Sequence, residues 1–255
     1  MKIAAILRQV PDVVEELVIA DDGRSLAEDE VMYVTNEADE HALEQALILK
    51  GRHGATVTAV SVGGDEARDA LATAVAKGAD EAVYVPVPFG DRGDNHRLAA
   101  HLAPAMKEGG YDLVLTGFWS ADQLDAGLAG LLAAHLSLPY VGGLVSVAVD
   151  ASTKKATVRK EFPGGRVGVM ELDLPALLGI QSAEQPPRYA PVSKVMQAKR
   201  TLQAKELGGS FPKEDGVRIE KLLKSDPAVR AEMLPGDAKA VADQIVRLLR
   251  ERGIV

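Results

Sequence analysis

The sequence contains no cysteine among its 255 residues, which excludes disulfide bonds and thiolate metal sites. Aromatic residues make up only 4% of the chain, so its 47% of hydrophobic residues must build a core of Ala, Val and Leu. No apolar run reaches the roughly 18 residues that a membrane-spanning helix needs. The short apolar start is typical of a buried strand, not of a secretion signal. We therefore expect a soluble, cytoplasmic protein that is not embedded in a membrane.

Positive charge is also scarce, with 29 Lys and Arg against 37 Asp and Glu and a formal net charge of −8. This balance argues against general nucleic-acid binding. The charge is uneven, because acids dominate up to residue 193 whereas bases outnumber acids from 194 to 255. The basic tail either has a role of its own or reflects drift in surface composition.

The usual catalytic and phosphate-binding motifs are missing as well. The first strand is not followed by G-x-G-x-x-G, and G-x-x-x-x-G-K-[ST] and G-x-S-x-G occur nowhere. No histidines are spaced to share a metal, and all of them fall within or beside predicted helices: His41, His53, His96, His101 and His135. We therefore predict no catalytic or metal-binding residues in this chain.

Strand and helix patterns alternate over roughly the first half of the chain. Such alternation predicts a doubly wound α/β fold with a parallel sheet and helices on both faces. Asn36 and Asp65 are the expected helix caps, and Gly51 or Gly54 is the expected stop of the first helix. The predicted strands are 2–10, 55–64, 81–87 and 111–117, with a strand-turn-strand at 17–26, and the predicted helices are 36–54, 65–80, 95–110 and one after 122.

The pattern changes after residue 140. Val alternates with polar residues over 141–180, with turns at 150–154 and 163–165, which predicts an antiparallel meander or a pair of hairpins. From Gln181 the chain is Pro-rich and irregular, and an amphipathic helix follows at 236–252. We predict an α/β nucleotide-binding domain over 1–190 and a C-terminal arm over 191–255. From the pattern alone, the arm could lie on another chain or pack back on its own body.

Ligands of open parallel sheets bind beyond the carboxyl ends of the strands. Gly117 would admit a flat ring there, and the amides of 122–128 would suit a phosphate at a helix start. Asp122 and Asp125 argue against a phosphate, and both are equally explained as helix caps without any ligand. The segments expected at this edge are Arg8–Asp12, Asn36–Asp39, Ser61–Gly64 and Thr116–Gly117.

Five stretches in this order and spacing resemble the beta subunit of electron transfer flavoprotein. They are KIAAILRQVPD, VMYVTNEADEHALEQALILK, VTAVSVGGDEARDALATAVAKGADEAVYV, YDLVLTGFWSADQ and PRYAPVSKVMQAKR. The resemblance covers most of the chain, and it implies a fold similar to the adenine nucleotide alpha hydrolase-like domains.

The resemblance implies a non-catalytic half of a heterodimeric electron carrier. In the family, the alpha subunit holds most of the FAD, and the beta subunit usually buries a structural AMP. Electrons come from flavoprotein dehydrogenases and pass to a quinone reductase or another acceptor. The arm from about residue 190 would wrap the alpha subunit, so we expect a chain ending at Lys199 to stay soluble and lose this pairing.

Carried over by position, the resemblance also implies site residues. The nucleotide site would comprise Ile6, Arg8, Asn36, Glu37, Ala38, Asp39, Val62, Gly117, Phe118, Trp119, Ser120, Ala121, Asp122, Gln123, Ala126, Gly127 and Leu128. The loop that docks onto the dehydrogenase would include Ser182, Ala183, Glu184, Arg188 and Tyr189.

The chain departs from the family where phosphate-holding side chains are expected. Phe118 and Trp119 stand in place of a polar residue and a glutamine, and Ala126-Gly127-Leu128 replaces Asn-Gln-Thr. AMP, FAD and an empty site therefore all stay open. The docking loop lacks the usual leucine, which predicts an unusual redox partner.

Two other functions compete with the electron-carrier subunit. One is a bifurcating homologue in which FAD bound to this chain takes part in catalysis. The other is a stand-alone adenine-nucleotide-binding protein of the universal-stress type. That type carries a late glycine-rich motif that this chain lacks, and it leaves the long tail unexplained.

Overall fold

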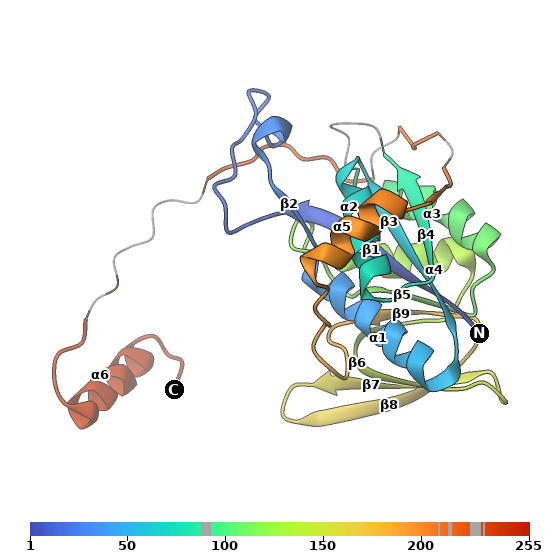
Figure 1. Ribbon diagram of the computed structural model, residues 1–255. Helices are drawn as coiled ribbons and strands as arrows, with labels where there is room; N and C mark the ends of the chain where they lie inside the picture. The colour runs from blue at the N-terminus through green and yellow to red at the C-terminus, as the bar shows by residue number, and fades with distance from the viewer. Residues whose placement is uncertain (88–92, 209, 214–215, 225–230, 232) are drawn as a thin grey trace. The chain divides into compact units, whose positions relative to one another are not determined.

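Within the described residues, ten strands form one mixed sheet in the order β10-β4-β3-β1-β5-β9-β6-β7-β8, with β2 beside β1 (Figure 1). The computed structural model describes residues 1–87, 93–208, 210–213, 216–224, 231 and 233–255. It divides the chain into two units, Met1–Glu220 and Lys221–Val255.

The strands are β1 (Lys2–Pro11), β2 (Tyr33–Thr35), β3 (Thr56–Gly63), β4 (Glu81–Pro86), β5 (Leu113–Gly117), β6 (Tyr140–Asp150), β7 (Lys155–Phe162), β8 (Arg166–Asp173), β9 (Ala176–Ile180) and β10 (Lys205–Glu206). The helices are α1 (Glu37–His53), α2 (Glu66–Lys77), α3 (Asn95–Gly109), α4 (Gly127–Leu136), α5 (Val192–Thr201) and α6 (Ala238–Glu251), with a short 3₁₀ turn at Glu28–Glu30.

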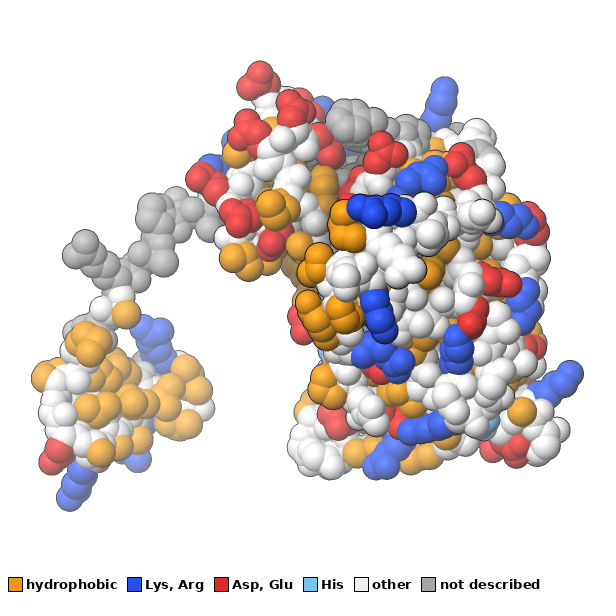
Figure 2. Space-filling model, in the orientation of Figure 1, with side chains coloured by type: hydrophobic (Ala, Val, Ile, Leu, Met, Phe, Trp, Pro, Cys, Tyr) orange, Lys and Arg blue, Asp and Glu red, His pale blue; other side chains and the backbone are white. Residues whose placement is uncertain are grey.

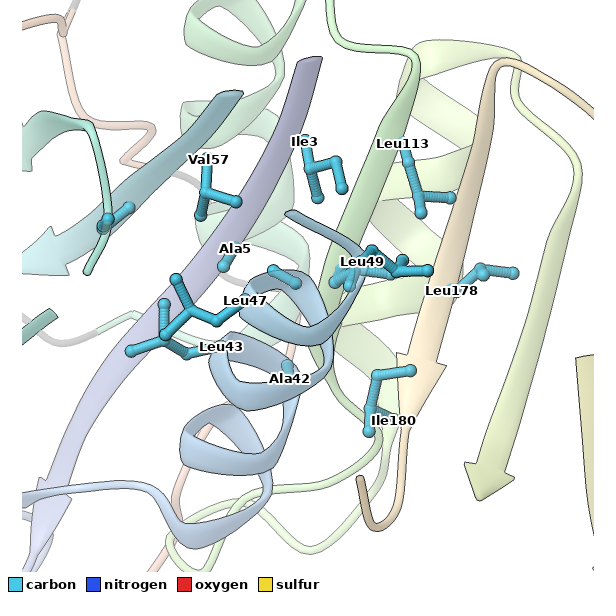
Figure 3. Close-up of a cluster of buried hydrophobic side chains, with 14 of the residues drawn as sticks. Ile3, Ala5, Ala42, Leu43, Leu47, Leu49, Val57, Leu113, Leu178 and Ile180 are labelled. Carbon is cyan, nitrogen blue, oxygen red and sulfur yellow. The ribbon is translucent and has the colours of Figure 1, made fainter. Parts of the chain in front are cut away.

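The centre of the sheet is parallel, because β4, β3, β1, β5, β9 and β6 pair in the same direction. Successive side chains of β1 face opposite sides, as the period of a strand requires. Ile3, Ala5 and Leu7 pack with α1 and α2, the cluster drawn in Figure 3, whereas Ala4 and Ile6 pack with α3 and α4. The predicted doubly wound α/β fold is thereby confirmed.

Local signals explain where the main helices end. The helix α1 stops at Gly54, which adopts the left-handed conformation with φ 62° and donates its N–H to the Lys50 carbonyl. Glycine adopts this conformation without the steric cost that a Cβ brings. Of the two predicted stops, Gly51 instead lies inside the helix. The helix α3 continues through Pro104, as predicted.

Two strand predictions need correction. The segment 17–26 forms only an isolated antiparallel bridge between Ile19 and Leu26 around the Asp22 turn. The five residues Ala176–Ile180 are not part of the antiparallel meander. They form β9, a fully buried parallel strand between β5 and β6. Their unbroken apolar run is typical of a parallel strand covered on both faces. Only β6, β7 and β8 form the predicted antiparallel addition.

The segment after Gln181 is more ordered than its composition predicts. Residues 192–201 form α5, which packs against α2 and pairs Lys199 with Asp69 at 2.8 Å. The strand β10 then adds to β4 in parallel. Phe211 stacks edge-on against His101, with ring centroids 5.0 Å apart. The first unit therefore extends to Glu220, past the predicted boundary at residue 190.

The second unit contains α6, which matches the predicted C-terminal helix. Asp237 caps it by accepting a hydrogen bond of 2.9 Å from the Ala240 N–H. Hydrophobic side chains gather on one face of α6, as Figure 2 shows. On this helix, Ile245, Val246 and Leu248 each expose more than two fifths of their surface. None of the described helices is long and apolar enough to cross a membrane.

Candidate functional site

A single buried carboxylate joins the ends of two central strands at the carboxyl edge of the sheet. Asp39, in the first turn of α1, accepts hydrogen bonds from the Arg8 N–H at 2.9 Å and from the Gly117 N–H at 2.8 Å. The Arg8 Nε also lies 3.3 Å from the carboxylate. Burial raises the pKa of Asp39, and the neighbouring Arg8 charge opposes that rise. The ends of β1 and β5 are thus tied to the start of α1.

The close approach of α1 explains why residue 117 is glycine. A Cβ at this position would lie 2.8 Å from the Ala38 carbonyl carbon and closer still to Asp39 Oδ1. The space that a side chain at position 117 would take is therefore filled by the start of α1. The flat ring that we expect beside Gly117 stays a prediction. The residues Ala38, Asp39 and Gly117 come together as predicted, but they do so by packing on one another.

Asn36 connects this cluster to the loop between β5 and α4. Its side chain is buried and donates to the Trp119 carbonyl at 2.8 Å, while its N–H donates to the Arg8 carbonyl. Asn36 occupies the predicted cap position of α1, but its side chain caps nothing. Its side chain instead holds the loop after β5 in place.

The loop between β5 and α4 contains two strained residues. Leu124 and Ala126 have φ values of 55° and 52°, a left-handed region that side chains other than glycine rarely adopt. Such strain clusters at functional sites. Ser120 is buried in this loop, whereas Trp119 is 39% and Leu124 72% exposed. The strain and the exposed apolar side chains mark this loop as the candidate ligand-binding element.

Phe118 packs on the sheet beside β6 and β9. Its ring lies over the paired glycines of β6 and β9, because a Cβ on Gly142 would meet the ring at 2.8 Å. The Lys160 ammonium of β7 lies 5.7 Å from the centre of the same ring. Phe118 therefore packs on β6 of the antiparallel addition. The polar residue that the family resemblance leads us to expect at this position would instead help to hold a phosphate.

The start of α4 is closed by a side chain of the loop itself. Asp125 Oδ1 accepts the Gly127 N–H at 2.9 Å and also contacts the Asn95 side-chain amide. Asn95 was not among the predicted site residues. It lies at the start of α3, is 2% exposed, and its Oδ1 has no hydrogen-bond partner within the described residues. The sequence signal that could have found it is a polar residue at the first, buried turn of a predicted helix.

The remaining predicted nucleotide-site residues take different places. Ile6 and Val62 are core residues of β1 and β3, and Leu128 of α4 is buried with them. Glu37 and Asp122 are exposed, and Ala121, Gln123, Ala126 and Gly127 are half-buried. Gln123 donates to the Gly93 carbonyl at 3.1 Å. The residues of this paragraph thus come from β1, β3, the loop between β5 and α4, and the starts of α1 and α4.

The predicted docking loop is held firmly against α1. Arg188 binds Glu44 through its guanidinium, at 2.7 and 2.9 Å, and through its main-chain N–H at 2.9 Å. Glu184 lies 2.6 Å from Arg52. Burial raises the pKa of Glu44, but the hydrogen bonds and the charge of Arg188 lower it by more, so the pKa lies below its ordinary value. The hydrogen bond from Arg52 likewise lowers the pKa of Glu184.

These contacts leave one prominent side chain on the docking loop. Tyr189 is 80% exposed, whereas Ser182 and Ala183 are half-buried and bonded through their N–H groups to Leu144 and His41. Glu44, which anchors this loop, was not among the predicted residues. A charged residue at a core-facing position of α1 is the signal that could have found it.

An adenine nucleotide fits this edge only in part. The loops and helix starts gather as an open sheet requires. The start of α4 already carries the Asp125 carboxylate. The loop 118–126 and α4 contain no Lys or Arg. Arg8 is already paired with Asp39. The described residues at the start of α4 therefore do not fit a phosphate. The described residues also include no cluster of three acidic or histidine side chains that could hold a metal.

Comparison with known proteins identifies the family of this fold. The family model described as the electron transfer flavoprotein domain matches residues 24–207. The electron transfer flavoprotein beta subunit of Clostridium acetobutylicum is 35% identical over 98% of this chain and 94% of its own length. That of Methylophilus methylotrophus is 29% identical over 98% of both chains. A caffeyl-CoA reductase–Etf complex subunit of Acetobacterium woodii is 29% identical over the full length of both.

Proposed function

Because the chain belongs to the family of electron transfer flavoprotein beta subunits, we propose that it forms the beta half of a heterodimeric electron carrier. The observation that carries this proposal is the match to named beta subunits over nearly the whole chain. The site is compatible with it, because the buried charges Arg8 and Asp39 are paired with each other. The redox chemistry would come from FAD bound mostly to the alpha subunit.

The chain's own residues would position that partner. The sheet edge around Asp39 and Asn36 is rigid, because buried hydrogen bonds tie β1, β5 and α1 together. The apolar face of α6 would lie on the alpha subunit. The burial of such a face stabilises association by roughly 25 cal/mol for each Å² removed from water.

The loop around Tyr189 would face the flavoprotein dehydrogenase that supplies electrons. Its backbone is preorganised by the Glu44–Arg188 and Arg52–Glu184 pairs, so docking would cost little ordering entropy. A quinone reductase or another acceptor would take the electrons onward. The missing leucine in this loop supports a dehydrogenase partner other than the ordinary medium-chain acyl-CoA enzyme.

The experiment is co-expression with the candidate alpha subunit from the same genome. We expect a 1:1 complex by size-exclusion chromatography that shows flavin absorbance and is reduced by a dehydrogenase of that organism. A chain that elutes alone, without flavin, under conditions in which the alpha subunit is folded would overturn the proposal.

One comparison supports a second candidate. The full-length match to a subunit of a caffeyl-CoA reductase complex favours a role within a larger reductase assembly, where this chain could hold its own FAD. Two flavins per heterodimer, released on denaturation, would distinguish this role from the simple carrier.

A further inference from the structure

The chain that follows β10 packs on the first turns of α3. The Phe211 ring lies edge-on to His101, with the ring centroids 5.0 Å apart, and the Arg97 guanidinium carbon lies 4.4 Å from the centre of the Phe211 ring. Arg97 Nε also donates to the Pro212 carbonyl at 2.7 Å. Arg97 and His101 are 8% and 4% exposed. Phe211 and Pro212 are therefore held on α3 by two buried side chains.

Asp94 holds the chain a second time, close to the end of the first unit. Its Oδ1 accepts the His96 N–H at 2.7 Å and the Arg97 N–H at 3.1 Å, and these bonds cap α3. Its Oδ2 accepts the Gly216 N–H at 2.8 Å and the Val217 N–H at 3.1 Å. One carboxylate thus starts a helix with one oxygen and binds the C-terminal arm with the other. We call Gly216 and Val217 the root of the arm.

These main-chain donors favour the ionised form of Asp94. Burial raises the pKa of Asp94, but the hydrogen bonds from the N–H groups of Val217, Arg97, Gly216 and His96 lower it by more, so the pKa lies below its ordinary value of 3.8. Hydrogen bonds to an ionised acceptor are about twice as strong as those between neutral groups. The root is therefore held by bonds of the stronger kind.

The same turn of α3 also binds the candidate ligand-binding loop. Gln123 donates to the Gly93 carbonyl at 3.1 Å, and the Asn95 amide contacts Asp125. The bonds to this loop and to the root of the arm thus involve the consecutive residues 93, 94 and 95. The first unit ends shortly after the root, and the second unit contains α6 with its apolar face. The arm therefore leaves α3 from a fixed point beside the candidate site.

We propose that Asp94 is a positioning residue for the C-terminal arm, and that its bonds to Gly216 and Val217 preorganise the arm for the alpha subunit. The inference rests on the proposed function, in which the arm lies on that partner. An arm whose root is already fixed loses less conformational freedom when it binds. Without these bonds, the root would have to be ordered during pairing, and the affinity would fall.

Asp94→Asn separates the two roles of this side chain. An amide has one acceptor oxygen in place of two, and asparagine caps helices about as well as aspartate. The cap donors are only two and three residues away, so the oxygen should stay with them and the root should lose its acceptor. In the isolated chain, we expect hydrogen exchange at Gly216 and Val217 to become at least about tenfold faster, the factor that a loss of 1.4 kcal/mol produces.

The same substitution should weaken the affinity for the alpha subunit at least about tenfold in analytical ultracentrifugation. The midpoint of thermal unfolding of the isolated chain should stay within a few degrees, because the cap of α3 is kept. Asp94→Ala removes both acceptors, so it should weaken pairing as much and also lower the midpoint further. Asp65→Asn is the matched control, because Asp65 is an exposed acid at the start of α2 whose side chain caps nothing. It should change the affinity by less than about threefold.

Unchanged exchange at Gly216 and Val217 in Asp94→Asn would overturn the anchoring role, and faster exchange with unchanged affinity would overturn the positioning role. Equal falls of the midpoint in Asp94→Asn and Asp94→Ala would assign the effect to the helix cap and would also overturn the inference. A wild-type chain that does not pair with the alpha subunit would overturn the proposed function and this inference together. Wild-type pairing that Asp94→Asn leaves intact would overturn this inference alone.

Discussion

Arg188 and Glu44 join the loop before α5 to the buried side of α1, with Arg188 Nη2 2.7 Å from Glu44 Oε1 and Nε 2.9 Å from Oε2. The Glu44 side chain is 4% exposed and the Arg188 side chain 43%. The loop is therefore anchored at one buried end, while its Tyr189 remains open to solvent. This arrangement has a consequence for stability and one for its dependence on pH.

Replacing Arg188 by Ala should lower the free energy of unfolding by about 1–3 kcal/mol, because it removes the guanidinium from the buried Glu44 carboxylate and leaves that carboxylate only the main-chain N–H of residue 188. Arg52→Ala removes a more exposed partner of the same loop and should cost about 1 kcal/mol or less. Urea unfolding of both variants measures the difference. Equal losses would show that burial of Glu44 does not set the cost.

The same pair should make stability fall in acid. The pKa of Glu44 is lower in the folded chain than its ordinary value of 4.5, so the unfolded state binds the proton first as the pH drops. The contribution is present above about pH 4.5 and is lost as the pH falls through the folded pKa. Glu44→Gln should flatten this part of the stability profile. An unchanged acid limb in urea titrations from pH 7 to 3 would contradict this assignment.

Gly117→Ala should destabilise the fold by about 1–3 kcal/mol, because its Cβ would force α1 away from β5. Gly51→Ala is the matched control in α1, where a Cβ meets nothing within 4 Å. It should stabilise the protein by about 0.5–1 kcal/mol through helix propensity. Thermal unfolding of the two variants should therefore shift in opposite directions, and a neutral Gly117→Ala would refute the packing role.

A chain ending at Glu220 should keep the midpoint of thermal unfolding within a few degrees of the full chain, because the first unit ends there. The shorter chain ending at Lys199, which the family resemblance suggested, loses β10 and the Phe211 contact. It should be less stable by at least about 2 kcal/mol, the scale of one large apolar side chain. Equal midpoints would show that residues 200–220 add nothing to the first unit.

The apolar face of α6 should decide pairing with the alpha subunit. Leu248→Asp in the full chain places a charge on that face and should weaken heterodimer affinity at least about tenfold, since burying an unpaired charge is costly. Arg247→Asp, an exposed position beside it, should change affinity less. Analytical ultracentrifugation with the alpha subunit measures both. An unchanged dimer of the Leu248 variant would place the interface elsewhere.

The main elements could be predicted from the sequence because their signals are local. Apolar periodicity and the left-handed glycine at Gly54 define α1 without reference to the rest of the chain. The parallel placement of β9 could not be predicted, because a short apolar run does not say which strands it will pair with. The helix α5 was missed for a similar reason, since its stability comes from packing on α2 and not from its own composition.

The candidate site divides in the same way. The sequence by itself determined that loops from β1, β3 and β5 meet at one edge, because parallel strands with helical crossovers can end nowhere else. Only the tertiary structure decided how those residues are used. It filled the space beside Gly117 with Asp39 and set Asp125 at the start of α4. Those contacts join residues far apart in the chain or depend on the exact turn of a loop, and such geometry leaves no periodic trace in the sequence.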